Sequence, residues 1–398
     1  MNILFIIPYF YPARSFGGPV SFLLELCEEL SRKHNIVVIT SDAFDLSNRI
    51  NYEYLKIFND VKVVYLRNLT MLTVKYSKLF ITLGLRQAIS KLIDKVDVIH
   101  AHEYRTYQNV IVLKTLQNVT NKKLFILQPH GSAIYYGRVI RKILFDNLWG
   151  YKILRTASKI IALTRAEKKY LTKLGVNAEK IEIVPLGINI NKYDKLRHII
   201  CKQYKTVNDE AENRVLFLGR LNRIKRVDVL IKAFAIVENE IRDIKPKLII
   251  VGPDEGELIA LRKLAKKLSL RNIEFTGPLY GIRKIREICR ATLLVLPSDY
   301  ETFPMTILEA YAFAKPVIAT DFPGVEDVVL NGKTGIIVKR GDHIKLANAI
   351  IQMLENKKII KYMGRYGRQY LEEKFTTQKI VEKIINIYLE KQNSGSYE

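Results

Sequence analysis

The feature that most constrains the fold is a series of short, unbroken apolar runs, most of them separated by segments with helical periodicity. Such a run is typical of a strand that is buried on both faces of a parallel sheet. The runs form two series, and each series predicts one doubly wound α/β domain. The first series lies at 3–7, 36–39, 61–66, 96–99, 124–127, 160–163 and 181–184, and the second lies at 215–219, 248–251, 273–275, 293–296, 317–319 and 336–338.

A polar and charged stretch, 189–213, separates the two series. A chain of 398 residues is too long for one ordinary core and fits two domains. The sequence therefore predicts a first Rossmann-like domain over 1–190, a linker over 191–213 and a second Rossmann-like domain over 214–360. Residues 361–398 follow with a strongly helical pattern.

Nothing in the sequence indicates secretion or membrane spanning. No basic segment with a cleavage site precedes the first apolar run, and no window approaches about eighteen uninterrupted apolar residues. The three cysteines, Cys27, Cys201 and Cys289, are far apart and in no metal-ligand spacing, which suits a reducing compartment. We therefore expect a cytoplasmic protein.

The net charge of +24 suits a nucleic acid, an anionic membrane or an anionic substrate as a partner. Residues 101–173 contain 14 Lys and Arg against 3 acidic residues, a local excess of +11. Within them, 135–159 mixes basic and apolar side chains at three- and four-residue spacing. Two interpretations stay open: a pair of helices in the interface of an anionic membrane, which would make the protein peripheral at the inner face, or a basic surface whose apolar side faces the domain's own core. The basic members are Arg138, Arg141, Lys142, Lys152, Arg155 and Lys159, and the apolar members are Ile140, Ile143, Leu144, Phe145, Leu148, Trp149 and Leu154.

The apolar run at 293–296 leads into a polar loop and then a helical segment. Pro304 suits the first turn of a helix, where its missing N–H would have no partner. Open α/β sheets bind ligands beyond strands of this kind, with helix N-termini directed at anions. The sequence therefore predicts a phosphate group at Met305 and Thr306, flanked by the carboxylates of Glu301 and Glu309.

A basic loop follows the run at 215–219. It contains Arg220 and Lys225. An Arg side chain offers a rigid fork to paired phosphate oxygens, and a Lys side chain offers a mobile point charge. The two together suit a diphosphate leaving group.

Two adjacent glycines, Gly17 and Gly18, stand between the first apolar run and a helical segment. Glycines at such a turn let backbone N–H groups come close to a phosphate. The full Gly-x-Gly-x-x-Gly pattern is absent, which disfavours a nicotinamide cofactor.

Histidines end two neighbouring runs of the first series. His130 follows the fifth run, while His100 and His102 end the fourth and share one face of the predicted strand. The pair could suggest a metal, but no third ligand follows at a suitable spacing, so we predict no metal site. We interpret both as lining of a site in which His102 and Glu103 contact an acceptor.

The strand, loop and helix with Glu301 and Glu309, together with the loop of Arg220 and Lys225, resemble the signature of retaining GT-B glycosyltransferases of group 1 (family 4). The resemblance covers essentially the whole chain. It implies two Rossmann-like domains facing across a cleft, with the last helix crossing back to the first domain. It also implies that the chain moves a sugar from a nucleotide-diphosphate donor to a hydroxyl of a glycan, glycolipid or lipid-linked intermediate, without a metal or another cofactor.

The resemblance also implies roles for single residues. Two positions depart from the family pattern: Arg226 stands where the family has Gly after Lys, and Pro323-Gly324 replaces Gly-Gly. The implied catalytic residues are His130, Glu301, Arg220 and Lys225, and the implied donor contacts are Gly17, Gly18, Arg220, Lys225, Leu279, Phe303, Pro304, Met305, Thr306 and Glu309.

Two other classes of protein compete with this interpretation. A nucleotide-sugar epimerase of the same fold would need no acceptor, and the glutamate pair and the basic loop argue against it. A basic nucleic-acid-binding protein would carry basic and aromatic residues along a groove, whereas 138–151 has the pattern of an amphipathic helix. We therefore expect a nucleotide sugar and a glycan or lipid-linked acceptor as partners, and no nucleic acid.

Overall fold

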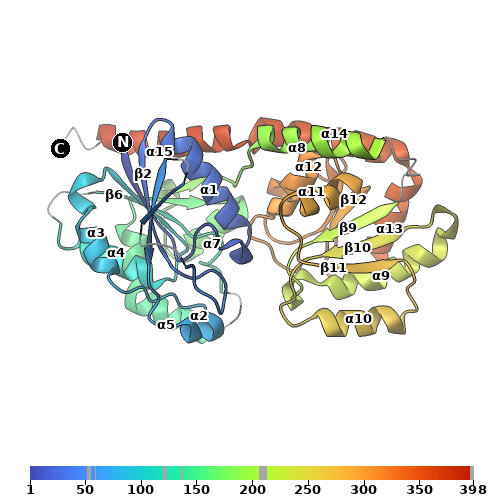
Figure 1. Cartoon of the computed structure of the whole chain (residues 1–398), viewed down its shortest axis with the longest axis horizontal. Coiled ribbons are helices and arrows are strands. Elements are labelled where there is room, and N and C mark those ends of the chain that lie inside the picture. Colours follow the sequence, from blue (N-terminus) through green and yellow to red (C-terminus); the bar gives the residue numbers. More distant parts are fainter. Residues whose placement is uncertain are drawn as a thin grey trace. The chain divides into compact units, whose positions relative to one another are not determined.

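The computed structural model describes residues 1–51, 55–58, 60–119, 123–135, 137, 139–205 and 213–394. The chain divides into two compact units. Unit 1 comprises Met1–Gly187 and Thr377–Glu398, and unit 2 comprises Ile188–Thr376. Each unit is a mainly parallel sheet with helices packed against it, which confirms the two α/β domains (Figure 1).

In the described part of unit 1, the sheet has eight strands in the order β3-β4-β2-β1-β5-β6-β7-β8. Neighbouring strands are parallel, except that β3, which was not predicted, runs antiparallel to β4. All seven predicted runs of the first series form strands. The strands are β1 (Asn2–Ile6), β2 (Asn35–Ser41), β3 (Leu55–Phe58), β4 (Val61–Leu66), β5 (Val98–His102), β6 (Leu124–Gln128), β7 (Lys159–Ala162) and β8 (Ile181–Ile183).

Helices cover both faces of this sheet. On β1, Leu4 and Ile6 join a core cluster with side chains of α3, α4 and α6, while the intervening Phe5 contacts His100 on the other side. This alternation is what a strand buried on both faces requires. The helices are α1 (Gly18–Ser31), α2 (Met71–Ser77), α3 (Leu85–Ser90), α4 (Tyr107–Leu116), α5 (Val139–Phe145), α6 (Tyr151–Thr156) and α7 (Arg165–Lys173), with a π-helical turn at Asp146–Gly150.

The strand order of unit 1 reverses between β1 and β5. The chain proceeds from β1 through β2 on one side, and from β5 through β6, β7 and β8 on the other. Open α/β sheets bind ligands outside the carboxyl ends of their strands at such a reversal. Gly17 follows β1 and His102 ends β5, so both predicted segments lie at this point.

Unit 2 has the sheet order β11-β10-β9-β12-β13-β14 among its described residues, and every pair is parallel. Here the order reverses between β9 and β12. The basic loop follows β9 and the acidic loop follows β12. The strands are β9 (Arg214–Leu218), β10 (Lys247–Val251), β11 (Ile273–Gly277), β12 (Leu293–Leu296), β13 (Val317–Thr320) and β14 (Gly335–Val338), and the helices are α8 (Ile190–Lys205), α9 (Val227–Glu240), α10 (Leu258–Lys267), α11 (Gly281–Arg290), α12 (Met305–Ala312), α13 (His343–Glu355) and α14 (Lys357–Lys374).

The last helix, α15 (Thr377–Ser394), belongs to unit 1 and packs on α1, which confirms the predicted return of the chain. The boundaries of the units differ from the predicted ones. The chain passes from unit 1 to unit 2 after Gly187, and most of the predicted linker is α8, which is part of unit 2. The rest of that linker, 206–212, lies outside the described residues.

Close packing fixes α12 against α14 in unit 2. A Cβ at Gly367 would lie 2.4 Å from the ring of Tyr311, and one at Gly364 would lie 2.0 Å from the carbonyl oxygen of Ala314. Any side chain at these two positions would force the helices apart. The helix that follows the acidic loop is therefore held by a contact that only glycine permits.

Two cysteines, Cys27 and Cys289, are in different chemical states. Cys27 on α1 is free and buried, and burial raises the pKa of its thiol. Cys289 on α11 is disulfide-bonded. The cysteine spacing, which suits a reducing compartment, did not predict this bond.

Candidate active site

In unit 2, a lysine and a glutamate meet where the strand order reverses. Lys225 Nζ lies 2.5 Å from Glu301 Oε1, and Ser298 Oγ donates to the same oxygen at 2.6 Å. Only 8% of Glu301 is exposed. Because β9 and β12 are neighbours, the loops after them place these charges together. An ammonium has three N–H donors, so Lys225 can hold Glu301 and a second anion at once.

Arg226, which replaces the glycine of the family pattern, adopts the backbone conformation of that glycine. Its φ of 48° and ψ of 42° lie in the left-handed region that favours the glycine of the family pattern. The side chain is held at both ends, because its guanidinium bonds to the carboxylates of Asp228 and Asp299. These bonds raise the pKa of the Arg226 guanidinium, so it stays charged. The bond to Asp299 thus ties the loop that contains Lys225 to the loop that follows β12.

The second predicted carboxylate, Glu309, lies inside α12 and is 7% exposed. Its Oε1 accepts from Lys284 Nζ at 2.5 Å and from Tyr193 OH at 2.9 Å. Lys284 comes from α11 and Tyr193 from α8, so three helices of unit 2 meet here. The sequence prediction missed both partners, since neither belongs to a recognised motif.

Arg220 lies apart from the Lys225 pair. Its guanidinium bonds to Glu255 at 2.8 Å, and Asn222 Nδ2 donates to the other oxygen of Glu255 at 2.7 Å. The loops after β9 and β10 touch closely, because a Cβ at Gly252 would lie 1.7 Å from the carbonyl oxygen of Gly219. Arg220 is 40% exposed in its side chain and is available to a ligand.

Four of the remaining predicted donor contacts lie at the start of α12. Pro304 is the N-cap residue, and Met305 and Thr306 form the first turn and are half-buried. Phe303 is buried and packs on Phe375, with the ring centroids 5.8 Å apart. Leu279 is half-buried in the segment between β11 and α11. The helix N-terminus therefore stands beside the acidic loop, as the sequence predicts.

In unit 1, three histidine rings form a continuous stack beside β1. The centroids of His100 and His102 are 4.5 Å apart, and those of His102 and His130 are 5.0 Å apart. His102 Nδ1 and His130 Nε2 are 2.7 Å apart and share a hydrogen bond. His100 Nδ1 bonds in turn to Tyr388 OH of α15 at 2.7 Å.

All three imidazoles are neutral at ordinary pH. Burial lowers the pKa of His100 and of His130 to about 3, and it lowers that of His102 well below its usual value. Only 1% of His102 is exposed, and its ring contacts that of His130. The acceptor contact at His102 stays a prediction.

His130 stands on a strained turn that a buried glutamate fixes. His130 and Gly131 both have positive φ, 51° and 76°. Glu167 of α7 accepts from the backbone N–H of Gly131 at 2.6 Å and from that of Leu163 at 2.7 Å. Burial raises the pKa of Glu167 to about 7. The sequence prediction missed Glu167, although it stands three residues after an N-cap threonine.

Glu103 follows β5 at the reversal of the strand order. Tyr9 OH, from the segment after β1, donates to Glu103 Oε1 at 2.8 Å. Burial raises the pKa of Glu103 to about 7, against the lowering effect of the Tyr9 bond. A carboxyl group with this pKa is suited to accept a proton near neutral pH.

The glycine turn lies beside the same strand end. Gly17 has φ 98° and precedes α1, whose first residue is Gly18. That φ lies in the region that a side chain rarely adopts, so the turn requires glycine. Tyr9 stacks on Phe16 next to this turn, with the centroids 4.4 Å apart.

Among the described residues, no group of three or more His, Cys, Asp or Glu side chains is placed to hold a metal ion. In the same part of the chain, no helix has the length and apolar character needed to cross a bilayer.

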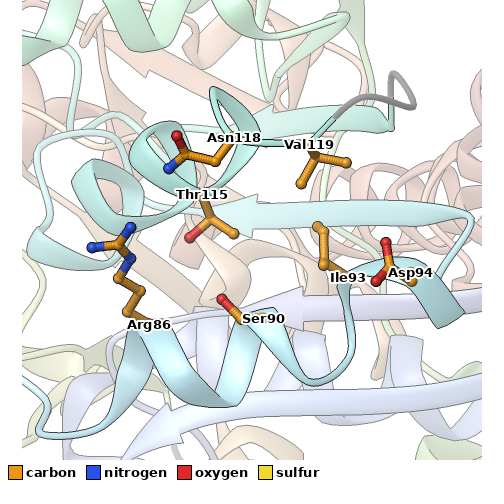
Figure 2. A pocket seen from close by; sticks show the side chains of 7 residues that line it. All are labelled: Arg86, Ser90, Ile93, Asp94, Thr115, Asn118 and Val119. Carbon is orange, nitrogen blue, oxygen red and sulfur yellow. The ribbon is translucent and has the colours of Figure 1, made fainter.

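A cavity of about 260 Å³ lies elsewhere in unit 1, between α3 and α4 (Figure 2). Arg86 and Ser90 point into it from α3, and Thr115 lies on the side of α4. No residue predicted for the site lines it. The motif residues gather instead at the two reversals of strand order.

Two family models match the chain. Residues 202–370 match the model described as Glycosyl transferases group 1, and residues 16–192 match that of Glycosyltransferase Family 4. Together they extend over both units.

Two curated relatives are 27% and 29% identical to this chain over the aligned residues. An uncharacterized glycosyltransferase of Methanocaldococcus jannaschii, MJ1069, is 27% identical over 276 residues, which cover 67% of this chain and 68% of the relative. N-acetyl-alpha-D-glucosaminyl L-malate synthase of Bacillus anthracis is 29% identical over 180 residues, 45% of this chain and 46% of the relative. The latter match thus spans about half of each protein.

Solved structures share the fold along nearly the whole chain. HepE of Anabaena, solved in complex with UDP and glucose, has a TM-score of 0.73 and 19% identity and covers 97% of this chain and 99% of its own. Sucrose-phosphate synthase of Thermosynechococcus elongatus has a TM-score of 0.76 and 19% identity and covers 99% of this chain and 100% of its own. At this identity the likeness establishes the fold and nothing finer.

Proposed function

The chain belongs to the group 1 glycosyltransferases of the GT-B fold, and from this premise we propose that it transfers a sugar from a nucleoside-diphosphate donor to an acceptor hydroxyl with retention of configuration. The observation that carries the proposal is the meeting of Lys225 and Glu301 at the reversal between β9 and β12. A cation and a carboxylate side by side match the two ends of a sugar diphosphate.

The cations serve the leaving group. Breaking the bond between sugar and phosphate builds negative charge on the phosphate oxygens, so catalysis requires positive groups placed there in advance. Lys225, Arg220 and the N-terminus of α12 supply them in unit 2. Glu301 accepts a hydrogen bond from a sugar hydroxyl, and Lys225 and Ser298 fix its orientation.

Glu309 binds the ribose of the nucleotide. One of its oxygens already accepts hydrogen bonds from Lys284 and Tyr193, which hold the carboxylate in place. The other oxygen accepts from the ribose hydroxyls. Uridine nucleotides are the first donors to test, because HepE was solved with UDP and with UDP-glucose.

The donor site requires no divalent metal. Asp299 and Glu301 form the Asp-x-Glu pattern that could hold one, but each carboxylate is engaged by a cation, Asp299 by Arg226 and Glu301 by Lys225. A metal would have to displace both. Lys225 and Arg220 take its role in neutralising the diphosphate.

On the acceptor side, Glu103 takes the proton of the attacking hydroxyl. Its pKa of about 7 suits that step better than the pKa of His130, which burial holds at about 3. His130 contacts the donor sugar near the reacting carbon. These roles belong to unit 1, and the acceptor is a glycan, a glycolipid or a lipid-linked intermediate.

A surface for an anionic membrane lies on α5 and the turn after it. Ile140, Leu144 and Leu148, four residues apart, are exposed at 84%, 59% and 47%, and Ile143 is exposed at 45%. These side chains form a stripe that does not face the core, while Phe145 and Trp149 on the opposite side pack against it. The core-facing interpretation of this segment holds for Phe145 and Trp149, whereas the other four apolar side chains support a membrane surface.

Exposed basic side chains lie near the stripe in sequence, and an ion pair between Arg105 and Asp146 fixes the turn after α5. Arg141, Lys152 and Arg155 are exposed beside it; Arg138 lies outside the described residues. The buried carboxylate of Asp146 receives two bonds from Arg105, at 2.9 and 2.6 Å. Basic heads bind lipid phosphates while apolar groups enter the acyl boundary. We place the protein at the cytoplasmic face of a membrane as a peripheral protein.

The function is tested by turnover. The protein is incubated with a panel of nucleotide sugars, with and without lipid-linked acceptors, and released nucleotide and product are read by mass spectrometry. Acceptor-dependent release together with a glycosylated product supports the transferase. Release of the free sugar or of its epimer, independent of any acceptor, would favour the epimerase instead.

A further inference from the structure

A second cavity of unit 1, the α6 cavity, lies between α6 and the segment that joins α7 to β8. Its volume is about 410 Å³, within the range of roughly 300–1,000 Å³ that is usual for small-molecule sites. Because α6 ends just before β7, and the joining segment ends where β8 begins, the cavity lies at the amino ends of these parallel strands. Glu103 and His130 follow the carboxyl ends of β5 and β6, at the opposite edge of the sheet. The α6 cavity is therefore separate from the candidate active site.

Apolar side chains form much of the cavity wall. Leu154 and Val176 are only 3% and 6% exposed, and Tyr151 and Leu174 are half-buried. Leu154 belongs to the core of unit 1, and Leu174 packs against that core. A hydrocarbon chain gains free energy when it covers such a wall, whereas a free sugar or an inorganic ion gains little.

Two cationic residues, Arg155 and Lys180, also line the cavity, and among the described residues no acidic side chain does so. The exposed guanidinium of Arg155 has no hydrogen-bond or ion-pair partner within the described part of the chain. Lys180 Nζ donates to the carbonyl oxygens of Arg155 and Ala157 at 3.2 and 3.4 Å, so its ammonium is held at the end of α6 and keeps a third N–H. A guanidinium and an ammonium at one place suit the oxygens of a phosphate group.

The α6 cavity also adjoins the surface that we propose for an anionic membrane. The helix α5, the π-helical turn and α6 form one uninterrupted helical run from Val139 to Thr156. Leu148, the last member of the exposed apolar stripe, stands three residues before Tyr151, about one helical turn away. A bilayer in contact with the stripe would therefore bring phospholipids next to the cavity.

We propose that the α6 cavity binds one anionic phospholipid, with the lipid phosphate on the two cationic side chains and the start of an acyl chain on the apolar wall. The proposal rests on the proposed membrane surface only in naming the bilayer as the source of the ligand. The bound lipid anchors unit 1 to the bilayer and takes no part in sugar transfer, because the cavity lies at the far edge of the sheet.

Calorimetry with a monomeric lipid tests the site apart from any bilayer. The probe is dihexanoyl phosphatidylglycerol below its critical micelle concentration, and the comparison ligands are dihexanoyl phosphatidylcholine and glycerol phosphate. We expect the probe to bind about tenfold or more tightly than either comparison ligand, because only the probe combines a net negative charge with acyl chains. Equal binding of glycerol phosphate would indicate a site for phosphate alone, and equal binding of phosphatidylcholine would indicate a site without charge selection. Either result, or no binding of the probe, would overturn the proposal.

A single substitution tests the cationic part of the site. Arg155→Gln should leave the fold intact, because the guanidinium has no partner to lose among the described residues. We expect the affinity for the probe to fall about tenfold. Lys152→Gln is the matched control, since Lys152 is exposed on the same helix, carries the same charge and does not line the cavity. An equal loss of affinity in the two variants would mean diffuse attraction by charge and would overturn the proposal.

Two further measurements separate this site from the apolar stripe and from the transferase. The variant Ile140→Asn with Leu144→Asn should keep its affinity for the probe, since neither residue lines the cavity, and a loss there would assign lipid binding to the stripe instead. Arg155→Gln should keep the turnover of a soluble donor and acceptor, and a fall in turnover would overturn a site separate from the reaction. Absence of transferase activity in the unaltered protein would refute the proposed function and leave the lipid measurement unaffected.

Discussion

Lys225 and Glu301 are 76 residues apart in sequence, yet Lys225 Nζ and Glu301 Oε1 are 2.5 Å apart. The pair forms because β9 and β12 are neighbours at the reversal of strand order. Both side chains are largely buried, with 16% and 9% of their areas exposed, so the interaction is only weakly screened by water. The pair therefore presents an oriented carboxylate and a shared ammonium group at one place.

Changing Glu301 to Gln should separate binding from turnover. The variant removes a negative charge beside Lys225, so UDP binds as well as before or more tightly, while kcat falls about tenfold or more because the sugar hydroxyl loses its charged partner. Glu274→Gln is the matched control, since Glu274 pairs with Lys247 of the neighbouring strand and both side chains are exposed, at 48% and 38%. Calorimetry and initial rates decide the outcome, and a parallel loss of UDP affinity and turnover would contradict the assigned role.

Glu309→Gln should weaken the binding of the nucleotide itself. Loss of a charged acceptor for the ribose hydroxyls reduces UDP affinity roughly 10- to 100-fold. The affinity for UMP should fall by the same factor, because both nucleotides carry the same ribose. If UMP binding survives unchanged while UDP binding falls, Glu309 serves the diphosphate and not the ribose.

Variants of Arg226 should show how much a side chain at a left-handed backbone conformation costs in stability. Arg226→Gly relaxes the backbone but loses the bonds to Asp228 and Asp299, so the two effects oppose each other. Arg226→Ala loses the bonds without relaxing the backbone and should be less stable than the glycine variant by about 1 kcal/mol. Urea unfolding compares the two, and equal stability would show that φ at this position costs nothing.

Activity should rise with pH through the titration of Glu103. Its pKa is raised to about 7, so the carboxylate that accepts the acceptor proton forms only as pH passes that value. Tyr9→Phe removes a bond that stabilises the carboxylate, so the rising limb of kcat/KM moves to higher pH. Glu103→Gln should abolish the limb. A limb that stays in place in Tyr9→Phe would assign the titration to another group.

The apolar stripe of α5 should bind anionic vesicles. Cosedimentation with phosphatidylglycerol vesicles should fall as salt rises, and fall sharply in the variant Ile140→Asn with Leu144→Asn. The control combines Ile259→Asn and Ile344→Asn, since both isoleucines are as exposed on helices of unit 2, at 71% and 56%. Equal binding to neutral vesicles, or an equal loss in the control, would contradict a membrane role for this surface.

Strands and charged motif residues could be predicted from the sequence, whereas their partners could not. Each apolar run formed a strand because a doubly covered parallel strand leaves a continuous signal. Tyr193 and Glu309 are 116 residues apart, and only the packing of α8 on α12 brings them together. The predicted linker contained most of that helix: Tyr193 and Ile200, seven residues apart, are buried on one helical face in a largely charged segment. Its polar composition hid the periodicity.

The measurement that tests the account most directly is the affinity of UDP for Lys225→Ala beside that for Lys247→Ala. Both variants remove a lysine that pairs with a glutamate in unit 2, at 2.5 Å for Lys225 and 3.0 Å for Lys247, but only Lys225 lies at the reversal of strand order. Loss of a charged contact to phosphate should lower the affinity for UDP roughly 10- to 100-fold in Lys225→Ala, and Lys247→Ala should leave that affinity unchanged. Equal affinity in the two folded variants would contradict a diphosphate site between β9 and β12.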